Sequence, residues 1–363
     1  MTLTAEKTST PNRTKLAVID CDIHNAAASG KALGKYLPER WRRHHETFGS
    51  HTHVGSDYPR ANLNAARTDS WPPSGLPPGA DLEFLRYQLL DQWGMDYGVL
   101  NPLNGAGAQL NLEYSAALCA ATNDWQIEEW LDPEPRLRGS IIVPYEDGEL
   151  SAAEIERRAS DRRFVHVLLV ARTSEPLGRR KYWKMFEAAE RHDIPVAFHF
   201  GGFGGSPITP VGFPSYYIED HAGMPTSFET QVVSLVCEGV FERFPRLKIV
   251  LIEGGFGWLP PLMWRLDNAW KKLKDEVPEL KRLPSEYIRE HFWITTQPME
   301  EPSRPKHFLE LLDHLNMNDR LMFATDYPHW DFDAPDQAVP TNLNPELERA
   351  IMAENARKLY RLT

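Results

Sequence analysis

The sequence predicts a (β/α)₈ barrel that forms a single domain over residues 1–363. Short runs of β-branched and aliphatic residues alternate with longer amphipathic segments, which is typical of parallel strands joined by crossover helices. Eight such runs can be counted along the chain. The length suits one barrel of about 250 residues that carries insertions.

The expected elements follow one another in a regular order. The strands are expected at Leu16–Ile23, Tyr97–Asn101, Leu137–Val143, Phe164–Ala171, Pro195–Phe200, Leu247–Ile252, Phe292–Thr296 and Leu321–Thr325. The helices are expected at Asp81–Trp93, Asn111–Trp130, Arg179–His192, Ser227–Phe244, Leu259–Glu276, Ser303–Leu315 and Pro345–Leu362. The connection near Pro144 to Ser160 is short, and no helix is assigned to it.

A long segment, Ala26–Pro78, interrupts this alternation after the first strand. It is rich in Pro, Gly, Ser, Asn and charged residues, and it has neither a helical nor a strand period. Its tryptophans, Trp41 and Trp71, are too large to leave in water without a partner. Because long loops in compact domains are usually functional or disordered, we predict that this insertion is a lid or an oligomer contact.

A Rossmann fold is the alternative architecture. Its fingerprint, G-x-G-x-x-G, is matched only in part, because Gly105 and Gly107 are followed by Leu110 where the third glycine belongs. This weak match favours the barrel.

Composition and charge exclude several classes of protein. A net charge of −11 argues against nucleic acid as the partner, because phosphate binding needs a basic surface. The three cysteines, Cys21, Cys119 and Cys237, are far apart and indicate a reducing, cytoplasmic compartment rather than a disulfide framework. The segment 1–15 lacks the apolar core of a signal peptide, and no apolar run is long enough to span a bilayer. We therefore expect neither secretion nor membrane insertion.

In a barrel the chemistry lies at the carboxyl ends of the strands, so polar residues that follow the strands are the candidates. After the first strand, Asp22 and His24 point to the same side because strand side chains alternate. His199 follows the fifth strand, next to glycines that leave room for a ligand. Asp326 ends the eighth strand, where a carboxylate is costly unless it is paired or binds a metal.

Two further strands end in charged groups. Glu253 follows the apolar sixth strand and is a candidate ligand, general acid or anchor for a ligand. Arg172 follows the fourth strand and is a candidate clamp for a substrate carboxylate. A salt bridge at the barrel rim is the alternative reading of each.

A second set of similar motifs lies in the insertion. His51 and His53 form an H-x-H pair, and Asp57 begins an Asp-Tyr-Pro triplet that Asp326 repeats. No apolar strand precedes them to place both imidazoles on one side, so we interpret them as exposed loop residues. Zincin, α/β-hydrolase and P-loop motifs do not occur.

Taken together, these strand-end motifs resemble the amidohydrolase-related family. The motifs are Asp22-x-His24, His199, Glu253-Gly254-Gly255 and Asp326-Tyr327-Pro328-His329, and the resemblance extends from Ala17 to Leu362. The family consists of metal-dependent barrels that include hydrolases and decarboxylases. The resemblance implies that Asp22, His24, His199 and Asp326 hold one divalent ion. Zinc suits these mixed ligands, with manganese or iron as alternatives.

Two positions depart from the family pattern. Asp22 stands where many relatives have His, and Glu253 stands where the decarboxylases usually have His, which argues against decarboxylation. A carboxylate at Glu253 suits a second metal. The resemblance therefore also leaves open a dinuclear oxygenase, or a partner subunit that binds metal without turnover.

The leading hypothesis is a metal-dependent hydrolase or lyase that acts on a small carboxylated or aromatic molecule. Asp326 would be both ligand and proton shuttle, and Glu253 or His329 would be the auxiliary acid or base. Arg172 and Trp258 are the expected substrate-binding residues. We expect a homo-oligomer, with a related second subunit as the alternative.

Overall fold

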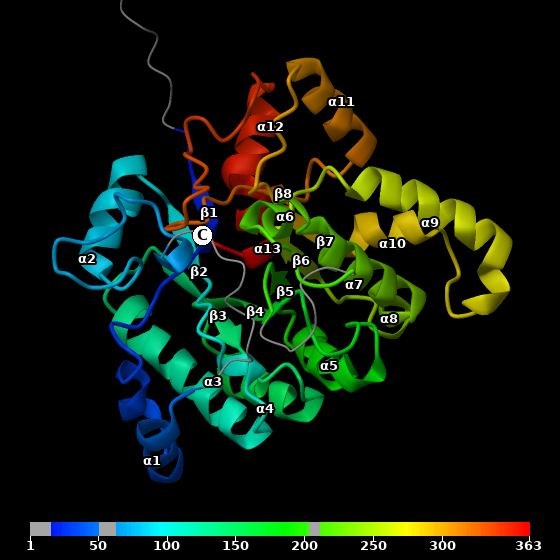
Figure 1. Ribbon diagram of the computed structural model, residues 1–363. Helices are drawn as coiled ribbons and strands as arrows, with labels where there is room; N and C mark the ends of the chain where they lie inside the picture. The colour runs from blue at the N-terminus through cyan, green and yellow to red at the C-terminus, as the bar shows by residue number, and fades with distance from the viewer. Residues whose placement is uncertain (1–15, 51–62, 203–210) are drawn as a thin grey trace, which may run out of the picture.

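The structure, a computed structural model, describes residues 16–50, 63–202 and 211–363. Within these residues, eight parallel strands pair in sequence order and form a nearly closed barrel (Figure 1). The predicted (β/α)₈ barrel is confirmed. The strands are β1 (Ile19–Ile23), β2 (Tyr97–Leu100), β3 (Leu137–Ile142), β4 (Phe164–Val170), β5 (Val196–His199), β6 (Ile249–Ile252), β7 (Phe292–Thr295) and β8 (Leu321–Met322).

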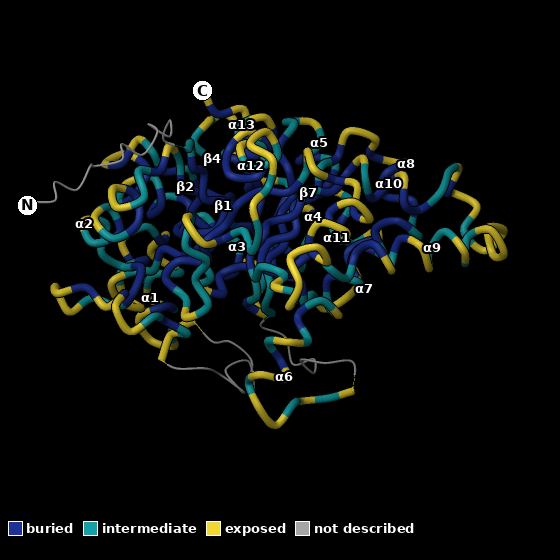
Figure 2. Tube along the Cα trace, turned by 90° about the horizontal axis from the view of Figure 1, so that it is seen from above, coloured by how far each residue is buried: buried dark blue, intermediate teal, exposed yellow. Residues whose placement is uncertain are grey.

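Helices surround the strands, as the amphipathic segments predict. They are α1 (Glu39–Phe48), α2 (Leu82–Leu85), α3 (Leu112–Gln126), α4 (Gly148–Arg158), α5 (Trp183–Arg191), α6 (Tyr217–Ala222), α7 (Pro225–Cys237), α8 (Val240–Arg243), α9 (Leu259–Leu273), α10 (Pro284–His291), α11 (Pro305–Leu315), α12 (Pro345–Arg349) and α13 (Asn355–Tyr360). Figure 2 shows the buried strands between partly exposed helices, with α6 and α13 on opposite sides of the barrel.

The strands are apolar because both faces of a parallel sheet in a barrel are covered. Every residue of β4 and of β6 is buried. The side chains on one face pack against the helices, and those on the other fill the barrel. This burial fixes the register, which in turn determines which residue stands last on each strand.

The first and last strands are shorter than expected. β1 begins at Ile19 rather than Leu16, and β8 ends at Met322 rather than Thr325. The reason is that the main chain after Met322 finds other partners. Phe323 N donates to Ile351 O, 2.9 Å away, and Thr325 N donates to a carboxylate oxygen of Asp20.

One helix, α4, lies in the connection to which the sequence analysis assigns none. It begins at Gly148, where the Asp147 side chain accepts a hydrogen bond from Leu150 N. Asp, Asn, Ser and Thr are favoured at this position because they satisfy a free backbone N–H group. Its buried face is formed mainly by small residues and Ile155, so the hydrophobic period is weak.

The described parts of the insertion reach two places on the barrel. In α1, the Trp41 ring lies 5.4 Å from that of Tyr114 on α3. Further on, Arg67 N donates to Pro328 O and Trp330 N donates to Ala65 O, so this part lies on the loop after β8. Whether the insertion acts as a lid or an oligomer contact stays a prediction.

Two expectations concern other parts of the chain. His51, His53 and Asp57 lie outside the described residues. Among the helices of the described ranges, none combines the length and the apolar character needed to cross a membrane.

Candidate metal centre

The end of β1 supplies two side chains to the mouth of the barrel. Asp22 and His24 point to the same side, as the strand period predicts, while Cys21 and Ile23 are fully buried in the core. The ladder with β2 is irregular between Asp20 and Ile23. Irregularities of this kind are common beside functional sites, where they redirect a side chain.

The residues that follow β6 and β8 have an unusual backbone. Glu253 and Asp326 adopt φ values of 57° and 63°, in the left-handed region that is unfavourable for residues other than Gly. The surrounding structure supports both: Glu253 N donates to Thr295 Oγ1, and Tyr327 N donates to Thr325 Oγ1. Strained residues of this kind cluster at functional sites.

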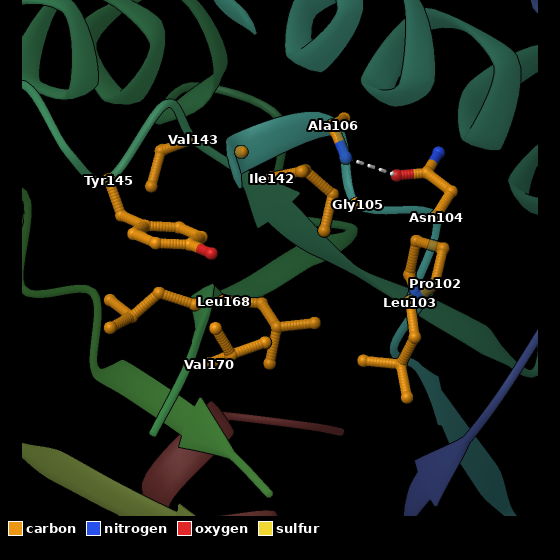
Figure 3. Close-up of a pocket in the computed structure, with 12 residues that line it drawn as sticks. Pro102, Leu103, Asn104, Gly105, Ala106, Ile142, Val143, Tyr145, Leu168 and Val170 are labelled. Atoms are coloured by element: carbon orange, nitrogen blue, oxygen red, sulfur yellow. Dashed lines mark hydrogen bonds between the residues drawn. The ribbon is translucent and has the colours of Figure 1, made fainter. Parts of the chain in front are cut away.

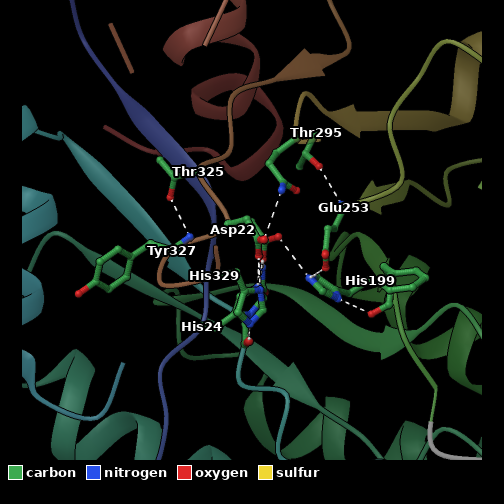
Figure 4. A network of polar contacts seen from close by, with 12 residues as sticks. Asp22, His24, His199, Glu253, Thr295, Thr325, Tyr327 and His329 are labelled. Carbon is green, nitrogen blue, oxygen red and sulfur yellow. Dashed lines mark hydrogen bonds and ion pairs between the residues drawn. The ribbon is translucent and has the colours of Figure 1, made fainter. Parts of the chain in front are cut away.

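Five side chains converge at this end of the barrel (Figure 4). Each contributes one ligand-type atom, and these atoms lie within 4.8 Å of one another. All five residues are buried: Asp22, His24, His199, Glu253 and Asp326. The structure therefore brings together the four predicted ligands and adds Glu253 to them.

Short contacts connect the five residues. His24 Nε2 lies 2.8 Å from Asp326 Oδ1 and 3.5 Å from Asp22 Oδ1. His199 Nε2 lies 2.8 Å from Glu253 Oε2 and 3.3 Å from Asp22 Oδ2. Each imidazole thus faces two carboxylates through its Nε2 atom.

Three carboxylates in a buried site repel one another and lose their hydration. Burial raises the pKa of Glu253 to about 7, and the charge of Asp326 adds to the effect. Burial likewise holds the pKa of Asp326 well above its usual range. Burial acts to lower the pKa of His24, but the Asp22 and Asp326 carboxylates together outweigh it and raise that pKa to about 9. These raised pKa values mean that the cluster favours protonated side chains, because added positive charge offsets the repulsion between its carboxylates. A divalent cation would supply this positive charge in place of the protons.

The donor atoms fit such an ion. Asp22 Oδ2 and His199 Nε2 are buried and form no hydrogen bond, and they face each other at 3.3 Å within the cluster. His24 Nδ1 lies 2.8 Å from Asn101 O, and His199 Nδ1 lies 2.6 Å from Phe200 O. Because each carbonyl accepts the Nδ1–H, each ring in its neutral form keeps its lone pair on Nε2, the atom that points into the site and that an ion would bind. Imidazole and carboxylate together suit zinc, manganese or iron.

The other predicted residues lie around this cluster. The ring of His329 stacks on that of His24 at 4.4 Å, and its Nδ1 is 2.7 Å from Asp326 Oδ1. Arg172 donates to Asp220 Oδ1, lies over the Phe200 ring and has a buried Nε without a partner. Trp258 donates its indole N–H to Gly254 O, which braces the loop after β6. The roles of these three residues stay predictions.

Sequence reasoning missed several polar residues at the same strand ends. Asn101 follows β2 and donates to Asp22 Oδ1 at 2.8 Å. Gln297, after β7, donates to Asp326 Oδ2, and it also reaches Asp331, which pairs with His221 on α6. The strand-end rule could have found Asn101 and Gln297, but it was applied only to side chains that bind metals or move protons.

Comparison with known proteins gives the family. The sequence profile of the family described as amidohydrolase matches residues 19–362. The chain belongs to the amidohydrolase family. It is 30% identical over 301 residues to gamma-resorcylate decarboxylase of Polaromonas sp. strain JS666, covering 78% of this chain and 88% of the relative. It is 29% identical to the enzyme of the same name from Rhodococcus jostii, over 68% of this chain and 78% of the relative.

Solved structures share the fold of this amidohydrolase. The 2,6-dihydroxybenzoate decarboxylase from Rhizobium aligns with a TM-score of 0.67 and 22% identity, over 96% of this chain and 99% of its own. The 5-carboxyvanillate decarboxylase from Novosphingobium aromaticivorans, with bound manganese, aligns with a TM-score of 0.73 and 18% identity. The alignment covers 98% of this chain and 100% of the Novosphingobium protein.

These findings confirm the expected class, a metal-dependent amidohydrolase-family enzyme that acts as a hydrolase or lyase on a small carboxylated or aromatic molecule. The residue cluster supports the expected divalent-metal site. The comparisons do not test the argument against decarboxylation from Glu253, although these two relatives are themselves decarboxylases.

Proposed function

We propose that this amidohydrolase is a metal-dependent, non-oxidative decarboxylase of hydroxylated aromatic carboxylic acids. The observation that carries the proposal is the buried cluster of five donor residues at the barrel mouth, in a chain related to gamma-resorcylate decarboxylases. A bound divalent ion would polarise the oxygen atoms of such a substrate and offset its negative charge. The reaction replaces the carboxylate of the ring by hydrogen and releases carbon dioxide.

The residues around the cluster suit this substrate. Arg172 lies at the end of β4, and its unpaired Nε offers a donor for a carboxylate. An apolar pocket lies between the ends of β2, β3 and β4 (Figure 3). Its lining includes Leu103, Ile142, Leu168 and Val170, and its volume of about 30 Å³ is too small to enclose an aromatic ring, so Arg172 carries the argument for the substrate.

The reaction needs one proton at the ring carbon that loses the carboxylate. The electron pair of the broken carbon–carbon bond stays on the ring and forms the new carbon–hydrogen bond. Asp326 is the proposed donor, and His329 would return the proton because its Nδ1 contacts Asp326 Oδ1. The His329 side chain is 19% exposed, so it connects Asp326 to solvent.

The identity of the ion is part of the proposal. Zinc is the expectation from the sequence, whereas three carboxylates with two imidazoles also suit manganese. Purification without added metal, followed by elemental analysis, tests the choice.

A cytoplasmic location and a homo-oligomer stay predictions. Size-exclusion chromatography with light scattering tests the oligomeric state.

The test of the function is direct. Protein loaded with Mn²⁺ or Zn²⁺ is incubated with 2,6-dihydroxybenzoate and with 5-carboxyvanillate, and the release of carbon dioxide and of the decarboxylated phenol is measured. We expect release with the wild type and a loss in Asp326→Asn. An exposed acid that precedes β8, Asp319, provides the matched control Asp319→Asn. Failure of the loaded protein to release carbon dioxide from any hydroxylated aromatic acid would overturn the proposal.

A dinuclear oxygenase is the second candidate, and the presence of Glu253 as a fifth donor favours it. This reading requires two redox-active ions per chain. One ion per chain would reject it, while nearly two equivalents of iron or manganese would support it. Two equivalents together with a co-purified related chain and no turnover of the isolated chain would instead indicate a partner subunit.

A further inference from the structure

A chain of buried hydrogen bonds runs from the far side of the barrel to Asp22. Tyr360, on α13, lies with its hydroxyl 3.0 Å from His166 Nδ1, and His166 Nε2 lies 2.9 Å from Asn101 Oδ1. Asn101 Nδ2 then lies 2.8 Å from Asp22 Oδ1. His166 comes from β4 and is fully buried inside the barrel, as are Asn101 and Asp22.

The chemistry of the groups sets the direction of every bond in this chain. The Asp22 carboxylate can only accept, so the amide nitrogen of Asn101 must face it. The amide oxygen of Asn101 therefore faces His166, which must donate from Nε2. Burial lowers the pKa of His166 to about 3, so the ring is neutral and its Nδ1 must accept. Tyr360 is left as the donor at the start of the chain.

Asn101 also orients His24, the second candidate ligand at the end of β1. Its backbone oxygen accepts from His24 Nδ1 at 2.8 Å, and its own N–H donates to Ile23 O at 2.7 Å. The main chain of Asn101 thus sets the tautomer of His24. The side chain of Asn101 sets the orientation of the Asp22 carboxylate, and only this second task depends on His166.

The arrangement leaves one oxygen of Asp22 for an ion. Oδ1 accepts from Asn101, whereas Oδ2 is buried, forms no hydrogen bond and faces His199 Nε2 at 3.3 Å within the cluster. A buried Tyr–His–Asn chain gives little net stability, because apolar groups of the same shape can replace both partners of a buried hydrogen bond at nearly no cost. Such a chain that ends on a candidate ligand is typical of the partners that orient metal ligands.

We propose that His166 and Tyr360 are positioning residues of the metal centre, which hold the Asn101 amide so that Asp22 presents Oδ2 to the ion. This proposal rests on the metal centre but not on decarboxylation. Its test therefore measures metal binding, so a negative result would overturn this proposal without bearing on the proposed decarboxylation.

The experiment compares the affinity of the metal-free protein for Mn²⁺, measured by calorimetry and by the electron paramagnetic resonance signal of free Mn²⁺. We expect His166→Phe, which cannot donate to Asn101, to bind Mn²⁺ about 10–100-fold more weakly. His166→Gln can donate to Asn101 and accept from Tyr360, so it should restore most of the affinity. Tyr360→Phe should show a smaller loss, because the Asn101 contact remains.

The matched control is His291→Phe. His291 is also buried, but it donates to Leu247 O and stacks on Phe241 at a different place in the barrel wall. This variant should lower the melting temperature without changing the affinity for Mn²⁺. Wild-type affinity in both His166→Phe and Tyr360→Phe would overturn the proposal, as would an equal loss of affinity in His291→Phe. If His166→Phe does not fold, failure of His166→Gln to bind Mn²⁺ more tightly than His166→Ala would overturn it.

Discussion

Two regions of the barrel wall, the β3–β5 side and the β1–β8 seam, deliver their functional residues in different ways. β4 and β5 pair at four consecutive positions, from Val167 with Val196 to Val170 with His199. Regular pairing thus places His199 as the last residue of its strand. At the seam, β8 has only two residues, and the closure depends on separate bonds such as Cys21 N to Phe323 O.

The seam nevertheless carries three of the five donors, Asp22, His24 and Asp326. Because the ladder ends early there, the main chain is free to turn Asp326 into the left-handed region. The buried carboxylate of Asp20 replaces the missing ladder bonds by accepting from Thr325 N and Thr325 Oγ1. Side-chain hydrogen bonds such as those of Asp20 therefore stabilise the seam, whereas backbone pairing stabilises the opposite wall.

The largest effect is expected from removing a donor at the seam. Asp326→Asn should lower turnover by about 10²–10⁴-fold, the range for a lost acid or base, and should also weaken metal binding. The melting temperature of the metal-free protein should not fall, because one of three crowded carboxylates becomes neutral. Full metal content and full turnover in this variant would show that neither metal binding nor the reaction depends on Asp326 at the seam.

Removal of the ion should affect the seam before the wall. At about 1,000 times its Kd, a ligand that binds only the folded state stabilises it by about 4 kcal/mol. Chelation should therefore lower the melting temperature and increase amide hydrogen exchange at Cys21 and His24, while Val167 to Val170 stay protected. An equal increase in amide hydrogen exchange at the β1–β8 seam and in β4 would contradict the proposed difference between these two regions.

The variant Asp20→Asn tests how the barrel closes between β8 and β1. The amide would turn a donor towards the Thr325 hydroxyl or N–H, and an unsatisfied buried group costs about 1–3 kcal/mol of folding free energy. We expect this loss in urea unfolding, together with weaker metal binding. Ser140→Ala, which removes a buried bond to Leu100 O on the opposite wall, is the control. It should lower stability without changing metal affinity, and a matching loss of metal affinity in this control would refute the comparison.

The smallest effect concerns Glu134, which precedes β3 and lies away from the metal centre. Hydrogen bonds from Arg136, with help from Arg86, lower the pKa of Glu134 to about 2, against burial that acts to raise it. A lowered carboxyl pKa contributes stability that is present above pH 4.5 and is lost as the pH falls towards 2. Because the arginines are partly exposed, we expect about 1 kcal/mol or less.

The check on Glu134 is acid unfolding of the wild type and of Glu134→Gln in the absence of metal. The variant should lose the part of the pH dependence between pH 4.5 and 2. An unchanged slope would mean that the ion pair adds nothing measurable on this wall.

Much of the fold was accessible from the sequence because buried strands need apolar runs. β6, for example, lies within the expected Leu247–Ile252. Among the helices that were not predicted, α4 has few large apolar residues, so its burial depends on its neighbours rather than on its own period. The early end of β8 also could not be predicted, because its cause is the carboxylate of Asp20, some 300 residues away in the chain.

The sequence by itself determined the barrel and the places where ligand-type side chains leave its strands, because strand period and burial are local properties. It also determined the family, since the motifs stand at those same strand ends. Only the tertiary structure decided that Glu253 joins the cluster, that Asp22 Oδ2 faces His199 Nε2 without a hydrogen bond and that Asn101 and His166 stand behind Asp22. These contacts join residues far apart in the chain, and their hydrogen-bond directions depend on which partners burial brings together.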